Sequence, residues 1–188
     1  PKFLMLKTTK SKKQTQRVDI DFFNANANMR VVDIEEAEGK IITRNMASLG
    51  SEREIKHYKK ILYSNVFEGV DIEFLIHESD GKHESGFKYN FIVHAGASLS
   101  NIKLKVNGAN KTQIKPSGAL EISTENFTLE DRIPLSYELD QTGKEGKKVL
   151  ARFVKMGKNE IGLAAQDYDL ERTLVIDPVS WCTYYGGQ

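Results

Sequence analysis

The chain is poor in the residues that would indicate a disulfide framework, a membrane span or a strongly charged partner. Its 188 residues include a single cysteine, Cys182, which cannot close a disulfide within the chain. No run of about 18 apolar residues occurs, so the sequence predicts no transmembrane helix. With 27 Lys and Arg against 26 Asp and Glu, the net charge of +1 creates no overall field for nucleic acid or an anionic membrane. We therefore expect no nucleic-acid partner and no membrane insertion.

The N-terminal stretch does not look like a secretion signal. "PKFLMLKTTK" has no long apolar core, no cleavage site of small residues and no initiator methionine, so we expect the chain to begin inside a mature or trimmed product. The basic stretch from Lys7 to Arg17 favours a solvated hairpin loop or turn, with a contact to a polyanion as the alternative.

What the sequence has in abundance is strict alternation of apolar and polar residues. Three tracts, "RVDIDF", "GVDIEFLI" and "GFKYNFIV", place every second, apolar side chain on one face. "NIKLKV" repeats the pattern with its lysines outward. Later tracts read in the same way: "GALEIS", "RIPLSYEL", "VLARFVKM", "EIGLAA" and "RTLVID". The pattern predicts strands that each bury one face.

One tract, residues 50–66, allows a helix. Its apolar residues Ile55, Tyr58, Ile61 and Leu62 recur at helical steps, and Ser51 suits an N-cap. The tract is interpreted either as one short helix or as a loop that runs into a strand.

Turn residues indicate how some strands pair. Asp80-Gly81 suits a two-residue type I′ turn, because both central positions need positive φ. A hairpin closed there predicts four pairs: Val70 with Phe91, Ile72 with Tyr89, Phe74 with Phe87, and Glu73 with Lys88.

Two further hairpins are expected. "KPSGA" predicts a three-residue loop with Gly118 in the left-handed region and Ile114 opposite Leu120. "MGKNEI" predicts Met156 opposite Ile161 and, further along, Val154 opposite Leu163. Closely spaced strands joined by such turns predict an all-β fold, an antiparallel sandwich or open barrel-like sheets with at most one short helix.

Catalytic signatures are missing. The sequence has no G-x-S-x-G elbow, no P-loop and no G-x-G-x-x-G, and Cys182 has no neighbouring histidine to act as a base. The acidic pairs Glu35/Glu36 and Asp167/Asp169 match glycosidase carboxylates in type alone, since the sequence reveals neither their separation nor a sugar cleft. We therefore expect that the chain is not an enzyme and has no catalytic residues and no cofactor. The sequence assigns no binding residues.

One cluster contains the side-chain types that bind metals: His77, Glu78, Asp80, His83 and Glu84. In the expected hairpin its first two residues point to opposite faces and the group lies at a solvent-exposed tip. We therefore expect no metal site here. His94, at the end of the next strand, is expected at the rim.

Several of the quoted tracts together carry a resemblance: "SNVFEGVDIEF", "FKYNFIVHAGASLSNIKLKVNGAN", "SGALEIST", "IPLSYE" and "LVIDPVSWCTYYGG". From Ser64 onward the chain resembles a bacterial domain family of unknown function. That family stands N-terminal to SBBP-type β-propeller repeats in secreted or surface proteins, which in Bacteroidetes are often type IX secretion substrates. Asn90, and His94 with Ala95, depart from its pattern.

The family motifs also have direct physical interpretations. Gly69 and Gly96 lie at strand junctions where positive φ is expected. Asp71 and Asp177 are expected to accept hydrogen bonds from turn amides. Pro178 should end the last strand, because it removes a ladder donor.

The resemblance implies a non-catalytic structural or cap module of an extracellular or cell-surface protein, with an adhesin or carbohydrate-binding module as the alternative. We expect residues 1–178 to form this module, either undivided or as two packed sub-sheets, 1–63 and 64–178. Residues 179–188 are expected to be an extended junction into a propeller, in which Trp181 packs on this or an adjoining domain. A sugar-stacking platform of Trp181, Tyr184 and Tyr185 is the alternative. The implied partners are the remainder of the chain and, for the alternative, other surface proteins or glycans.

Overall fold

The computed structural model describes residues 2–9, 14–37, 41–44, 52–55, 58–77, 86–132 and 135–177. Within them the fold is all-β, as predicted, and every strand pairing is antiparallel. The elements are β1 (Lys2–Thr9), β2 (Gln14–Phe22), β3 (Arg30–Glu36), β4 (Ile41–Arg44), β5 (Glu52–Ile55), β6 (Tyr58–Phe67), β7 (Val70–His77), β8 (Gly86–Val93), a 3₁₀ turn η1 (Leu99–Asn101), β9 (Leu104–Asn107), β10 (Lys111–Ile114), β11 (Leu120–Ser123), β12 (Thr128–Asp131), β13 (Leu135–Leu139), β14 (Glu145–Lys155), β15 (Glu160–Gln166) and β16 (Leu174–Asp177).

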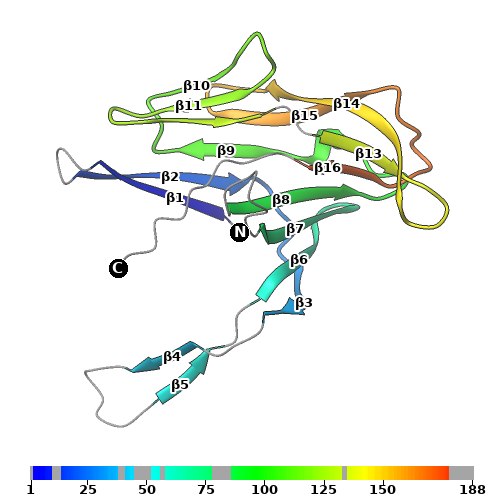
Figure 1. Ribbon diagram of the computed structural model, residues 1–188. Helices are drawn as coiled ribbons and strands as arrows, with labels where there is room; N and C mark the ends of the chain where they lie inside the picture. The colour runs from blue at the N-terminus through cyan, green and yellow to red at the C-terminus, as the bar shows by residue number, and fades with distance from the viewer. Residues whose placement is uncertain are drawn as a thin grey trace.

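One large sheet dominates the fold. It has 11 strands in the order β1-β2-β9-β15-β14-β13-β16-β8-β7-β6-β3. The sheet curls into a half-barrel, and the three-stranded sheet β10-β11-β12 lies at one side of it (Figure 1). Strands β4 and β5 pair with each other.

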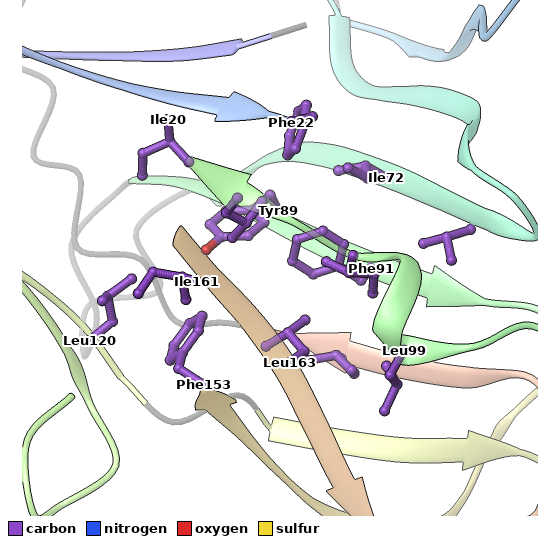
Figure 2. Close-up of a cluster of buried hydrophobic side chains, with 14 of the residues drawn as sticks. Ile20, Phe22, Ile72, Tyr89, Phe91, Leu99, Leu120, Phe153, Ile161 and Leu163 are labelled. Carbon is purple, nitrogen blue, oxygen red and sulfur yellow. The ribbon is translucent and has the colours of Figure 1, made fainter. Parts of the chain in front are cut away.

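The core fills the inner side of the curled sheet. The predicted alternation is confirmed in β2, where Val18, Ile20 and Phe22 are buried. In β13 the apolar residues were predicted on the buried face, and this was wrong: Ser136 and Glu138 are buried and Leu135 is exposed. The small sheet contributes to the same cluster, in which Leu120 of β11 lies with Ile161 and Phe153 (Figure 2). The two sheets therefore share one core.

The β7–β8 hairpin confirms the pairing of these strands but not the predicted register. Val70 lies opposite Val93 and Ile72 opposite Phe91, a shift of two residues from the expected partners. Glu73 faces Asn90 rather than Lys88, and the last pair is His77 with Gly86. The observed register does not fit a two-residue turn at Asp80-Gly81, so the predicted register was wrong. Residues 78–85 themselves lie outside the described residues. Alternation specifies which face a residue occupies, so a shift of two leaves the apolar face intact.

The other two predicted hairpins have different outcomes. At "KPSGA" the prediction is confirmed, because Ile114 faces Leu120 and Gly118 has φ +83°. At "MGKNEI" the prediction was wrong by one residue: Phe153 faces Leu163 and Val154 faces Gly162. The observed register puts Phe153 and Leu163 on the buried face together, whereas the predicted register would have opposed an inward residue to an outward one.

The helix allowed for residues 50–66 does not form, and the alternative of a strand is confirmed by β5 and β6. Tyr63 of β6 pairs with Ile72, and its ring packs edge to face on Phe74 at 5.3 Å between centroids. Packing on β7 therefore overrides the helical spacing. In the basic stretch, β1 and β2 form the predicted hairpin, with Thr9 opposite Gln14.

No helix in the described part of the chain is long and apolar enough to cross a membrane. The expected division at residue 63 falls inside β6 and stays a prediction. The expected junction, residues 179–188, and Pro178 lie outside the described residues.

Candidate functional site

Two of the tracts that carry the resemblance, around "FEGVD" and "VHAGA", meet at one corner of the sheet, where β6 turns into β7 and β8 ends. Asp71 lies in β7, and its Oδ1 accepts a hydrogen bond from the backbone N of Asn65 at 2.6 Å. Its Oδ2 lies 2.9 Å from His94 Nε2. His94 in turn donates its backbone N–H to the carbonyl of Gly69 at 2.9 Å. We call Asp71, His94, Asn65 and Gly69 the corner cluster.

The backbone at this corner is tightly constrained. Gly69 and Gly96 have φ of +68° and +79°, which confirms the prediction of positive φ at both. A Cβ on Gly69 would lie 2.6 Å from the Cβ of Ala97, so the turn tolerates no side chain there. The segments "FEGVD" and "VHAGA", distant in the sequence, are therefore in direct contact.

A histidine paired with a carboxylate is also an arrangement used for general acid–base catalysis. Here both oxygens of Asp71 are engaged, one by the backbone amide of Asn65 in β6 and one by His94, whose side chain is about half exposed. The predicted rim position of His94 is confirmed. Asp71 accepts a backbone amide as predicted, but the donor, Asn65, lies within β6 where the register shifts, and not in a turn. The geometry of the cluster holds two strand ends together.

A second polar group crosses the outer face of the sheet. Glu73 accepts a hydrogen bond from Asn90 Nδ2 at 2.9 Å and forms an ion pair with Lys60 at 3.1 Å. Lys88 lies 3.6 Å from Asp177 at the end of β16. These contacts connect β6, β7, β8 and β16. Burial raises the pKa of the nearby Tyr137 above its usual value, and the charge of Asp177 adds to the effect.

A buried carboxylate closes the opposite end of β16. Glu138 of β13 is almost fully buried and accepts the backbone N–H of Asp169 at 2.8 Å. Lys147 lies 3.8 Å from the same Glu138 oxygen and also donates to the carbonyl of Asp167. Asp169 itself pairs with Arg172 at 3.4 Å. Asp169 thus organises a turn through its side chain, whereas Asp167 contributes its backbone carbonyl.

A buried hydrogen bond joins the two sheets. Tyr89 of β8 donates its hydroxyl to Asp131 Oδ2 of β12 at 2.6 Å, and both residues are buried. The sequence contains no local signal for this contact, because the partners are 42 residues apart. The alternation placed Tyr89 inward, and that was the one hint in the sequence.

Among the described residues no three His, Cys, Asp or Glu side chains gather as a metal site. The side chain of His77 and the rest of its predicted cluster, including His83, lie outside the described part, as do Cys182, Tyr184 and Tyr185. The absence of metal there stays a prediction. Glu35 and Glu36 lie exposed on the edge strand β3.

An open groove of about 350 Å³ lies where η1 meets β14 and β15. Leu99, Ile102, Val154, Met156 and Tyr168 supply apolar surface, and Ser98 and Ser100 supply hydroxyls. Apolar lining with a few hydroxyls is compatible with a small ligand but specifies none.

Comparison with curated proteins and with solved structures gives no significant match. Comparison with protein families matches residues 5–179 to a domain of unknown function, DUF7948. The match spans the corner cluster, the whole of β16 and most of the hairpin β1–β2. The chain belongs to this family, the domain of unknown function DUF7948.

Proposed function

We propose that this domain is a non-catalytic structural module of a secreted or cell-surface bacterial protein, and that it stands N-terminal to β-propeller repeats as a cap or spacer. The observation that carries the proposal is the set of contacts that the motif residues make. Asp71, His94 and Gly69 contact backbone and a neighbouring strand end, and none of the three lines the groove beside η1.

The corner cluster is the clearest case. Asp71 uses one oxygen to bind the amide of Asn65, which has φ +55°, a conformation uncommon in residues other than glycine. Its second oxygen meets His94, so the turn before β7 and the end of β8 are held in register. A motif used in this way maintains a shape, and maintaining a shape is the task of a spacer or cap.

The position of the last strand also supports the proposal. β16 lies between β13 and β8 inside the large sheet, and Leu174 and Ile176 are fully buried. A strand paired on both sides connects the next segment of the chain to the core rather than to a frayed edge. This arrangement suits a module that supports a further domain.

The alternative is an adhesin or carbohydrate-binding module. The groove beside η1 favours it, because Tyr168 offers an aromatic ring and Ser98 and Ser100 offer hydroxyls in one place. Sugar recognition commonly combines such groups.

A glycan array probed with the domain separates the two functions. The cap function predicts no glycan signal above that of a heat-unfolded sample. Binding that disappears in Tyr168→Ala but persists in Tyr137→Ala would replace the cap with the adhesin. Location is tested with an antibody against the domain, since a surface protein is labelled on intact cells and an internal one is labelled after lysis.

A further inference from the structure

The outer face of the large sheet carries an exposed apolar pair beside the point where β16 ends. Leu135 of β13 lies directly opposite Asp177 of β16 on one side and opposite Leu150 of β14 on the other. Leu135 is 48% exposed and Leu150 is 66% exposed. The neighbouring residues Ser136 and Val149 are buried on the inner face, so the pair points away from the core.

Apolar surface continues across this face. Tyr137 lies opposite Val175, which in turn lies opposite Ile92 of β8. Val175 is 6% exposed and Tyr137 is partly buried. We call Leu135 and Leu150, at the exposed end of this stretch, the outer pair. The outer faces of antiparallel sheets are normally polar where water covers them.

Two cations lie on either side of Leu150 on the same face of β14. Lys148 and Arg152 are each two residues from it, and both are exposed. Within the described part of the chain neither side chain forms an ion pair or hydrogen bond. The outer pair is therefore an apolar spot between two cations, a surface that suits a large aromatic ring because cations are attracted to its face.

We propose that the segment beyond Asp177, residues 179–185, docks on the outer pair with the indole of Trp181 covering Leu135 and Leu150. Trp181 is the fourth residue after Asp177, and four residue steps of extended chain span about 13 Å. Leu150 lies two strands from β16, and adjacent strands are about 4.8 Å apart, so the pair is within reach.

The cross-strand row of the outer pair also identifies the segment that covers it. Asp177 is the last residue of β16 and already lies in the cross-strand row of the outer pair, so the chain leaves the sheet next to this spot. Its first large aromatic residue beyond that point is Trp181. The docking involves this chain alone and needs no residue beyond position 188.

Trp181 is the single tryptophan of the chain, so its fluorescence reports this contact directly. We expect emission of the native protein at shorter wavelength than in urea, with low quenching by acrylamide. Leu150→Gln should move the emission to longer wavelength and raise quenching toward the value of the unfolded chain. The fold should persist, because Leu150 is an exposed residue, and circular dichroism checks this.

The matched control is Leu170→Gln. Leu170 is similarly exposed, at 60%, but precedes β16 at the end opposite to Asp177, so its replacement should leave the emission unchanged. A native emission equal to that in urea overturns the proposal, and so does an emission that Leu150→Gln does not move. An emission that shifts with protein concentration would assign the outer pair to a second copy of the chain and equally overturn it.

Discussion

At the scale of single residues, one buried contact between the two sheets depends on a single hydroxyl. Tyr89 donates to Asp131 at 2.6 Å inside the shared core, so removing the hydroxyl leaves a buried carboxylate with one donor fewer. Tyr89→Phe should lower the free energy of unfolding by about 1.5–3 kcal/mol, the range for hydrogen bonds to charged groups. Urea titration measures this loss. Tyr63→Phe, in a partly buried ring with no such bond to the described residues, should cost less than about 0.5 kcal/mol, the usual range for changes away from buried polar contacts. Equal losses in the two variants would refute the role of the Asp131 contact.

The same residues show how far sequence reasoning extends. Asp71 was predicted to bind a turn amide because carboxylates commonly accept such bonds, and it does accept a backbone amide, but from Asn65 inside β6. The partnership of Asp71 with His94 could not be predicted, because it requires knowing that β7 and β8 meet at the same corner. Asp131 and Glu138 are buried carboxylates that composition gives no reason to single out. Long-range polar partners follow from topology, which no local pattern contains.

At the scale of elements, alternation and turn chemistry contain different information. The alternating tracts identified the buried face of β7 and β8 correctly, because side chains change face at every residue. The register was wrong because it was derived from a two-residue turn at Asp80-Gly81, and the observed pairs do not fit a turn at that position. Where the loop residues defined the turn, as at Gly118, the register was correct. Faces are thus predictable from strands alone, and registers require the loop.

The β7–β8 register can be tested by cross-linking in a Cys182→Ser background. Leu75 and Lys88 are direct neighbours, so Leu75→Cys with Lys88→Cys should form a disulfide on mild oxidation. Glu73 and Lys88, the pair expected from the two-residue turn, are diagonal neighbours about 7–8 Å apart, and their cysteine variants should remain reduced. Gel mobility without reductant distinguishes the two. A cross-link in the second pair and none in the first would restore the register predicted from Asp80-Gly81.

At the scale of the whole molecule, the strand order ties the two ends of the chain into one sheet. β2 pairs with β9, and β16 is inserted between β13 and β8, so neighbours in the sheet are distant in the sequence. A chain that ends at residue 172 would lack β16 and leave both of its neighbours with unpaired edges, in addition to losing the buried Leu174 and Ile176. We expect this truncation to abolish cooperative unfolding altogether.

The control for this truncation is a larger deletion, of residues 38–57, which removes the separately paired β4 and β5. Because Glu36 and Tyr58 are directly opposite in the β3–β6 ladder, a short glycine-rich turn can join the remaining ends. That variant should unfold in one transition at nearly the native urea midpoint, measured by circular dichroism. If the deletion of residues 38–57 unfolded the domain while the loss of β16 did not, the core would not be organised around its last strand, and the role proposed for β16 as the support of a further domain would fail with it.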